Sequence, residues 1–96
     1  MKKTVVVNIN NESYDIFIGR PSIWGNPYKI GKDGTRNEVI EKYYHYIKSS
    51  NYLMSKIHRL RGRTLGCYCK PKPCHGDVLV KILEELEIEN FMKGGS

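Results

Sequence analysis

Apolar residues near the start of the chain form two short runs of the kind that β-strands contain. The segments KTVVVNI (3–9) and SYDIFIGR (13–20) are rich in β-branched and aromatic residues, and a turn-prone NNE separates them. This spacing favours a hairpin, with a crossover as the alternative, so we expect the first two strands to be neighbours. A third run, RTLGCYC (63–69), predicts a short central strand.

Elsewhere the apolar residues recur at helical spacing. Thr35 and Glu38 have the spacing of a capping box, and the apolar stripe that follows predicts a helix over residues 36–49. A second predicted helix ends near Gly62. The last helix begins only after the proline-rich segment KPKPCHG, since proline disrupts a helix interior.

The order strand, strand, helix, helix, strand, helix predicts an α/β fold. We expect a small three- to four-stranded sheet, at least partly parallel, with helices packed on one or both faces. Residues 1–93 are assigned to a single domain and residues 94–96 to a flexible tail. If the second and third strands are parallel neighbours, the loops that follow them leave the same carboxyl edge, where open α/β sheets bind ligands.

The loop after the second strand, GRPSIWGNPYKIGKDGT (19–35), contains residue types that bind nucleotides. Arg20 offers a bidentate fork for a phosphate or a carboxylate. Trp24 and Tyr28 provide faces on which a purine can stack, and the Asn26 amide can bind a base edge or a hydroxyl. The alternative for Trp24 is a core position beneath the loop.

Composition and charge narrow the range of partners. The 96 residues carry a net charge of +6, and no acidic residue lies between Glu41 and Asp77, whereas eight lysines and arginines do. A basic middle indicates an anionic partner, either a nucleic acid or a phosphate-bearing small molecule, and the alternative is a solvated basic face. Nucleic acid is not favoured, because the sequence contains no recognised nucleic-acid module.

Hydropathy and size give expectations about location and assembly. No apolar run approaches the roughly 20 residues of a membrane span, and the start of the chain lacks the pattern of a signal peptide. We therefore expect a cytoplasmic protein without a membrane partner. Tyr43, Tyr44 and Tyr46 spread around the first predicted helix, which favours a homo-oligomer.

Three cysteines and a histidine cluster in the last loop, at Cys67, Cys69, Cys74 and His75. These are zinc-binding residue types, but structural zinc sites pair their ligands two to four residues apart on two separate knuckles. The spacing here does not fit that pattern. We expect no bound metal and no cofactor, with a zinc module as an alternative.

The three thiols are expected to differ. Cys67 is predicted to be a small buried apolar residue of the central strand. Cys69 and Cys74 lie at a helix start beside Lys70 and Lys72, an environment that lowers the pKa of a thiol and gives it thiolate character.

The segment His75-Gly76-Asp77 opens the last helix. Backbone amides that lack partners at a helix start attract anions, and Gly76 would let the backbone approach a ligand closely. His75 beside this terminus can donate to a phosphate or a ribose, or is an exposed loop residue. The alternative for Asp77 is that it serves as the N-cap.

Two segments, IGRPSIWGNPY (18–28) and CYCKPKPCHGDVL (67–79), resemble the motifs of an uncharacterised family of small phage and bacterial proteins, domain-of-unknown-function family 4326. Tyr28 stands where phenylalanine is more usual in that family. The resemblance implies that both motifs form one site in a small α/β domain. It implies no established reaction.

The leading hypothesis is a protein that binds a nucleotide derivative, of the ADP-ribose type or a cyclic nucleotide, and in a phage sequesters a host immune signal. The alternatives are an enzyme, either a nucleotide hydrolase or a glycosidic-bond transferase, and a zinc- or nucleic-acid-binding module. The enzyme hypothesis has Asp77, His75 or a thiolate at Cys69 or Cys74 as candidates. Asp77 is the only acid in either motif, so a paired acid/base system is missing and no catalytic residue is assigned. The predicted ligand-binding residues come from both loops: Arg20, Pro21, Ser22, Trp24, Gly25, Asn26, Cys69, Lys70, Pro71, Cys74, His75, Gly76 and Asp77.

Overall fold

A computed structural model describes residues 2–94, which form a small parallel sheet with helices packed on it. The sheet contains β1 (Val5–Asn8), β2 (Ile16–Phe17) and β3 (Thr64–Cys67), with β3 in the middle and both pairings parallel. The helical elements are α1 (Arg36–Ser49), α2 (Asn51–Lys56), a 3-10 helix η1 (Ile57–Leu60) and α3 (His75–Gly94). The α/β fold with its small, parallel sheet is confirmed.

The predicted hairpin between the first two strands is wrong, because β3 lies between them. Leu65, Gly66 and Cys67 of β3 are buried, so the backbone of this strand must find its hydrogen bonds within the protein, and it finds them on both edges. The connection between β1 and β2 folds over the outer face of the sheet instead. A Cβ on Gly66 would lie 2.6 Å from Cγ2 of Ile9 and 2.7 Å from Cγ of Tyr14.

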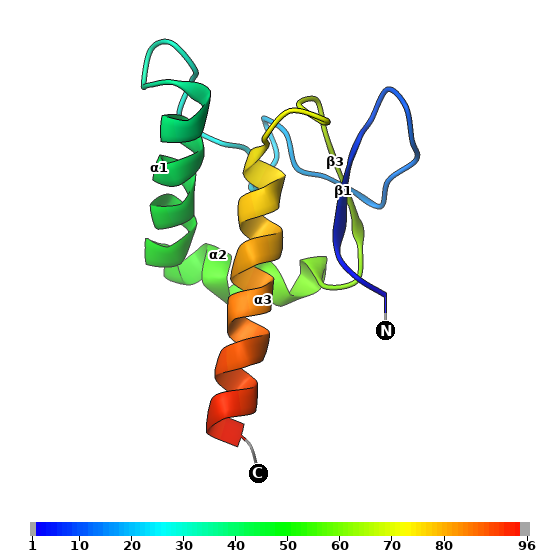
Figure 1. The fold of residues 1–96 in the computed structure, drawn as a ribbon, viewed down its shortest axis with the longest axis vertical. Helices are drawn as coiled ribbons and strands as arrows, with labels where there is room; N and C mark the ends of the chain where they lie inside the picture. Colours follow the sequence, from blue (N-terminus) through cyan, green and yellow to red (C-terminus); the bar gives the residue numbers. More distant parts are fainter. Residues whose placement is uncertain (1, 95–96) are drawn as a thin grey trace.

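The parallel pairing of β2 with β3 confirms that the two motif loops leave the same edge of the sheet. Residue 18 follows β2 and residue 68 follows β3, and both segments continue toward the end of the molecule where α1 begins (Figure 1). This edge is the carboxyl edge of the sheet, which is where ligands bind in open α/β folds.

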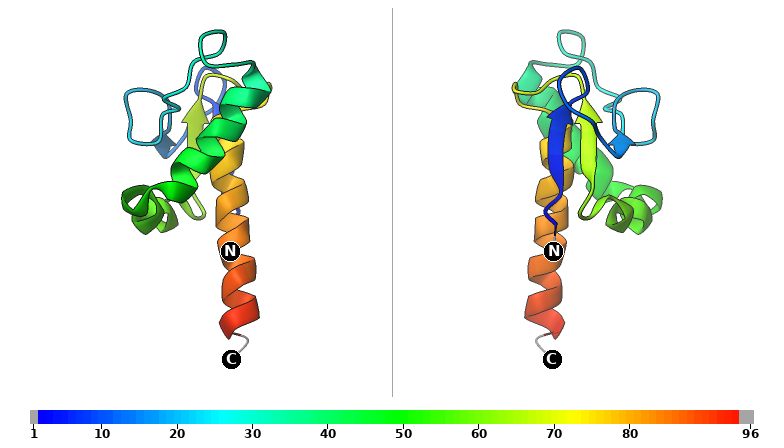
Figure 2. Two further views of the ribbon diagram at one scale, coloured as in Figure 1. Left: turned by 90° about the vertical axis from the view of Figure 1, so that its left-hand side faces the viewer. Right: turned by 90° about the vertical axis from the view of Figure 1, so that its right-hand side faces the viewer.

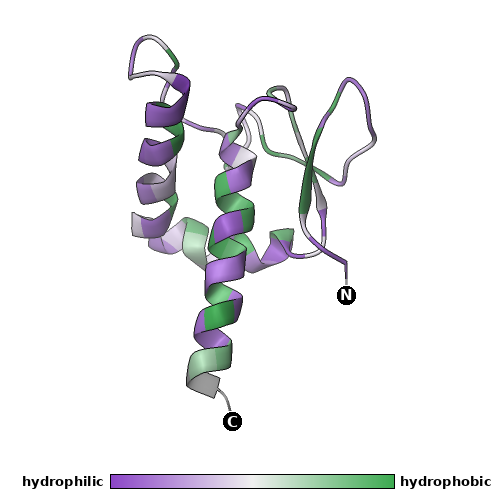
Figure 3. Ribbon diagram, in the orientation of Figure 1, coloured by the Kyte–Doolittle hydropathy of each residue, from purple (hydrophilic) through white to green (hydrophobic). Residues whose placement is uncertain are grey.

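The helices cover one face of the sheet. Figure 2 shows β1 and β3 in front of α1 and α3 in one view and behind them in the opposite view. Apolar residues occur in β1 and recur along α3 (Figure 3). The largest fully buried side chains come from the two motif loops, β3, α1, η1 and α3: Ile18, Tyr43, Ile47, Ile57, Leu60, Leu65, Cys67, Cys74, Leu79 and Ile82.

The helix boundaries follow their local signals. The Thr35 hydroxyl accepts a hydrogen bond from the Glu38 amide, and the Glu38 carboxylate accepts one from the Thr35 amide, so the predicted capping box starts α1. Gly62, with φ of 76°, ends the second helical segment in the left-handed region that glycine tolerates. Gly94 is the last residue of α3, and the rest of the predicted flexible tail, residues 95–96, lies outside the described residues.

Candidate functional site

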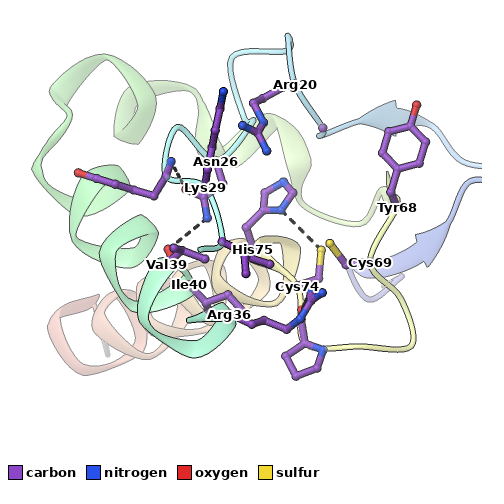
Figure 4. Close-up of a pocket in the computed structure, with 14 residues that line it drawn as sticks. Arg20, Asn26, Lys29, Arg36, Val39, Ile40, Tyr68, Cys69, Cys74 and His75 are labelled. Carbon is purple, nitrogen blue, oxygen red and sulfur yellow. Dashed lines mark hydrogen bonds between the residues drawn. The ribbon is translucent and has the colours of Figure 1, made fainter. Parts of the chain in front are cut away.

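A pocket of about 640 Å³ opens at the carboxyl edge of the sheet, between the loop after β2, the first turn of α1 and the loop before α3 (Figure 4). Three cationic side chains line it: Arg20, Lys29 and Arg36. No carboxylate belongs to the described residues of its lining. The pocket is therefore electropositive and suits an anionic ligand.

The three cations differ in how firmly they are held. Nη1 of Arg36 donates to the carbonyl oxygen of Pro73 at 3.2 Å, which ties the start of α1 to the loop before α3. Arg20 and Lys29 are exposed, and within residues 2–94 neither side chain has a hydrogen-bond or ion-pair partner. The guanidinium of Arg20 is directed toward the His75 ring (Figure 4). Arg20 and Lys29 are therefore available to a ligand, while Arg36 also shapes the wall.

His75 lies at the floor of the pocket with a defined tautomer. Its Nε2 lies 2.7 Å from the carbonyl oxygen of Ile18, and because a carbonyl only accepts, Nε2 carries the proton. Nδ1 is then an acceptor, 3.6 Å from Sγ of Cys74. Burial lowers the pKa of His75 below its ordinary value, and the nearby charge of Arg20 lowers it further. The ring is therefore neutral at pH 7.

Cys74 is a buried thiol that caps α3. Its Sγ accepts a hydrogen bond from the Gly76 amide at 3.3 Å, while the Asp77 carboxylate accepts from the Cys74 amide at 3.1 Å. Burial raises the pKa of Cys74, and a hydrogen bond with Cys67 adds to the rise. The predicted thiolate character of Cys74 is therefore wrong, because desolvation outweighs the helix start. Cys69 is half-buried and lines the pocket.

Most of the helix-start amides that were expected to bind an anion already have partners within the chain. The amides of Cys74 and Gly76 are bonded to side chains, and the Asp77 amide donates to the Cys74 carbonyl at 2.9 Å. Gly76 is buried against the sheet, where an added Cβ would lie 2.7 Å from Ile18 and 2.8 Å from Val6. Gly76 thus permits close packing of α3 on the strands, and ligand approach is not its role.

Asp77 is neither the N-cap nor a pocket residue. It is the third residue of α3, and its second carboxylate oxygen accepts from Nζ of Lys70 at 2.5 Å. This ion pair also occupies Lys70, so both residues stabilise the loop before α3. Pro21 and Pro71 are exposed, each follows a cis peptide bond, and neither lines the pocket.

Trp24 belongs to the core, so its predicted stacking role is wrong. Its side chain is only 5% exposed, and the hydroxyl of Tyr43 donates to the Trp24 carbonyl at 2.6 Å. The indole fills the space beneath the loop and offers no free face to a ligand. Burial of so large an apolar ring stabilises the loop that holds Arg20.

The neighbours of Trp24 hold the same loop in shape. Asn26 lines the pocket, but its side-chain amide donates to the Val39 carbonyl at 3.1 Å and its oxygen accepts from the Tyr28 amide at 2.9 Å. Ser22 accepts from the Trp24 amide at 3.3 Å. An added Cβ on Gly25 would lie 3.0 Å from the backbone of Arg20. The predicted use of Asn26 to bind a base edge is therefore not available while these bonds hold.

Of the residues predicted from sequence, the structure brings five to the pocket: Arg20, Asn26, Cys69, Cys74 and His75. Sequence reasoning missed Lys29, Arg36 and Tyr68 as site residues. Arg36 could have been found from the sequence, because a cation in the first turn of a helix interacts unfavourably with the helix dipole. Such a residue suggests a role other than helix stabilisation. Tyr68 directly follows the central strand and is 62% exposed, which its place beside two cysteines did not indicate.

Two tyrosines form the aromatic part of the wall. Tyr68 packs its ring edge-on against Phe17, with centroids 5.6 Å apart, and remains largely exposed. Tyr28 is half-buried, packs edge-on against Tyr46, and has the Lys42 ammonium 5.7 Å from its centroid. Tyr68 therefore has the more accessible ring face of the two.

Metal ligands are not assembled in the described part of the chain. Within residues 2–94, no group of three or more histidine, cysteine or acidic side chains is placed to hold a metal ion. The absence of a metal stays a prediction for solution experiments.

Comparison with known proteins identifies the family. The sequence profile described as "Domain of unknown function (DUF4326)" matches residues 2–85. The chain belongs to this family. This confirms the resemblance found in the two motifs, and both motif loops lie within the matched range. No solved structure matches the chain significantly.

Two viral relatives extend over most of the chain. An "Uncharacterized 12.4 kDa protein in nrdA-td intergenic region" of Enterobacteria phage T4 is 41% identical over 91 residues, which cover 90% of this chain and 82% of the relative. "Uncharacterized protein R718" of Acanthamoeba polyphaga mimivirus is 33% identical over 98 aligned positions, with coverage of 83% and 75%. In the described residues, no helix has the length and apolar character needed to span a membrane.

Proposed function

We propose that this protein binds a nucleotide derivative in the pocket at the carboxyl edge of the sheet. The observation that supports this most directly is the convergence of Arg20, Lys29 and Arg36 on a cavity whose described lining contains no carboxylate. Such a cavity attracts phosphate groups, and guanidinium groups bind them with paired hydrogen bonds.

Size and aromatic content favour a nucleotide over a simple anion. The volume of about 640 Å³ falls within the roughly 300–1,000 Å³ typical of small-molecule sites, far more than inorganic phosphate needs. The exposed ring of Tyr68 offers a stacking surface for a base, and Val39 and Ile40 supply apolar wall. The His75 Nδ1 acceptor can receive a hydrogen bond from a ribose hydroxyl if it leaves the Cys74 thiol.

Binding without turnover is the form of this function that the site supports best. The Cys74 thiol is protonated and buried, and the Asp77 carboxylate is engaged by Lys70 and by the Cys74 amide. Neither is available as a nucleophile or a general base in the present arrangement. The enzyme alternative, a nucleotide hydrolase or glycosidic-bond transferase, would therefore have to use His75 or Cys69, the remaining candidates that line the pocket.

A biological role follows from binding alone. A small phage protein that holds a nucleotide of the ADP-ribose type or a cyclic nucleotide in the host cytoplasm would lower the concentration of a signal used in host immunity. The phage relative makes this setting relevant, although its printed name assigns no activity. Sequestration requires only affinity and abundance, which fits a site with cations and without an acid/base pair.

Calorimetric titration with ADP-ribose, cyclic nucleotides, nucleoside monophosphates, the matching nucleosides and inorganic phosphate tests the proposal. We expect a phosphate-bearing nucleotide to bind and its nucleoside to fail. Arg20→Ala should weaken binding by about one to two decades, the equivalent of roughly 1.5–3 kcal/mol for a charged hydrogen bond. Arg59→Ala, an exposed arginine of η1 outside the pocket, is the matched control and should bind normally.

Two further measurements distinguish the alternative functions. Mass spectrometry of the ligand after heat release returns it unchanged from a binder and altered from an enzyme. Affinity for a single-stranded oligonucleotide that falls steeply with salt, with no nucleotide binding, would favour the nucleic-acid alternative. Equal affinity of Arg20→Ala and the native chain for the bound nucleotide would remove this pocket from the function.

A further inference from the structure

Two thiols of the loop before α3 lie together in the pocket wall. Cys69 and Cys74 both line the pocket, and Figure 4 shows the sulfur of Cys69 pointing toward that of Cys74. Cys69 also packs against the buried cluster to which Cys74 belongs, and its charge is among the causes that raise the pKa of Cys74. The two sulfurs are therefore neighbours in the folded chain.

Hydrogen bonds hold the segment between the two thiols in a reversed path. The Lys72 amide donates to the Cys69 carbonyl at 2.8 Å, which closes a tight turn directly after Cys69. Nδ2 of Asn8, the last residue of β1, donates to the Lys70 carbonyl at 2.8 Å and anchors the turn to the sheet. Because the turn reverses the chain, it directs side chains five positions apart toward each other.

The thiols differ in their access to solvent. Cys69 is half-buried, whereas Cys67 and Cys74 are buried, so a small oxidant in the pocket reaches Cys69 first. Attack of a thiolate on a peroxide places negative charge on the departing oxygen. Arg20 and Lys29, which are exposed and line the same pocket, stabilise such a charge. The pocket therefore favours oxidation at Cys69.

We propose that Cys69 and Cys74 are a peroxide-sensitive pair that forms a reversible disulfide within the chain. The Cys69 thiolate attacks one oxygen of hydrogen peroxide, the O–O bond breaks, and a sulfenic acid and hydroxide are formed. The Cys74 sulfur then displaces the sulfenic hydroxyl group, which leaves as water with the thiol proton of Cys74. Overall, two thiols lose two electrons and one peroxide becomes two waters.

Cys74 is suited to the second step because it lies beside the sulfur that is oxidised first. Burial raises the pKa of its thiol and keeps it from reacting with peroxide itself. A sulfenic sulfur on Cys69 is an electrophile that needs no access from solvent to reach Cys74. Nδ1 of His75, an acceptor 3.6 Å from Sγ of Cys74, can pass the thiol proton to the leaving hydroxyl as the S–S bond forms. No free thiolate at Cys74 is then required.

Peroxide treatment of the full chain, followed by alkylation in denaturant and peptide mass spectrometry, tests this pairing. Chymotrypsin cleaves after Tyr68 and so separates Cys67 from the other two thiols. We expect the peptide that contains Cys69 and Cys74 to lose two hydrogens and escape alkylation, while Cys67 is alkylated. Dithiothreitol should restore both thiols. In urea, where the pocket is lost, disulfides that include Cys67 should also form.

Three variants, each checked for its fold by circular dichroism, assign the roles. After peroxide, Cys69→Ser should keep Cys74 as a thiol, and Cys74→Ser should leave on Cys69 a sulfenic acid that dimedone captures. Cys67→Ser is the matched control and should still form the disulfide.

The native chain decides the matter even if a variant fails to fold. Thiols that both survive peroxide, a disulfide that includes Cys67 or joins two chains, or the same pairings in the folded chain as in urea would overturn the proposal. A folded Cys67→Ser chain without the disulfide would do the same. No nucleotide enters these measurements, so the disulfide and nucleotide binding can fail separately.

Discussion

His75 at the start of α3 donates a hydrogen bond from Nε2 to the carbonyl oxygen of Ile18, 57 positions earlier and directly after β2. This bond joins the two motif loops at the floor of the pocket. It also fixes the histidine as a neutral ring with Nδ1 as acceptor, beside the Arg20 guanidinium. The two loops are therefore one structural unit, and a change in either should affect the other.

Arg20 and His75 should be coupled in ligand binding. His75→Ala removes part of the pocket wall and the hydrogen bond to Ile18. It should weaken binding of the nucleotide found by titration, but by less than Arg20→Ala does. Because the residues are adjacent and would contact one molecule, the loss in the double variant should differ from the sum of the single losses by about 0.5 kcal/mol or more. Calorimetry on the two single variants and the double variant measures this. Strict additivity would mean that His75 and Arg20 act on separate features.

Stability should fall as the pH drops below neutrality, in part because of His75. Burial is the main cause that lowers the pKa of His75 in the folded protein, and Arg20 adds to it; the hydrogen bond to the Ile18 carbonyl and the charge of Asp77 raise the pKa without cancelling the shift. The unfolded chain takes up a proton near the ordinary pKa of about 6.5. Stability from the neutral ring is therefore complete above that pH and declines as the pH falls toward the lowered value.

Urea unfolding at about pH 7.5 and about pH 5.5 measures this dependence. His75→Gln, which keeps a donor for the Ile18 carbonyl and cannot be protonated, should reduce the difference between the two pH values. A larger difference in His75→Gln than in the native chain would contradict the lowered pKa.

Gly76→Ala should destabilise the protein although it lies in a helix. Helix propensity alone predicts a gain of about 1 kcal/mol. The added methyl would approach Ile18 to 2.7 Å and Val6 to 2.8 Å, and Ile18 is fully buried with little room to move. Overpacking of this kind costs roughly 1–3 kcal/mol, so we expect a net loss in the free energy of unfolding. A higher unfolding midpoint in urea would show that α3 can shift away from the sheet.

The thiols should react in an order set by burial. Cys69 is half-buried at the pocket, whereas Cys67 and Cys74 are 0% and 1% exposed, and the pKa of Cys74 is raised. Alkylation of the native protein near pH 7.5 should modify Cys69 first, and the other two only after unfolding. Mass spectrometry of the alkylated peptides identifies the site. Early modification of Cys74 would instead support the thiolate character that its position at a helix start predicts.

A bound ligand should also change the rate at which Cys69 is alkylated. Because Cys69 lines the pocket beside Tyr68, a bound nucleotide should slow its alkylation. Protection by a nucleotide that calorimetry shows to bind, and not by its nucleoside, would link the thiol to the proposed site. Alkylation at an unchanged rate would place the ligand elsewhere.

The sequence by itself determined the local structure and the family. Thr35 with Glu38 predicted the start of α1, and Gly62 the end of the second helical segment, because caps and left-handed glycines depend on neighbouring residues. Two motifs, each an unbroken segment of the sequence, identified the family. The order of strands and helices along the chain predicted the α/β class. The expectation that the two strands before the motif loops are parallel is confirmed.

Only the tertiary structure decided which side chains face the pocket. Trp24 and Gly76 had plausible ligand roles by residue type, but contacts with distant residues such as Tyr43 and Ile18 place them in the core. Arg36 reaches the site because α1 begins beside the loop before α3. The position of β3 between β1 and β2 was likewise set by burial of its backbone, a long-range demand that the turn-like NNE could not reveal. Residue types and local spacing fix the elements, whereas burial, which depends on the whole fold, determines what each side chain can do.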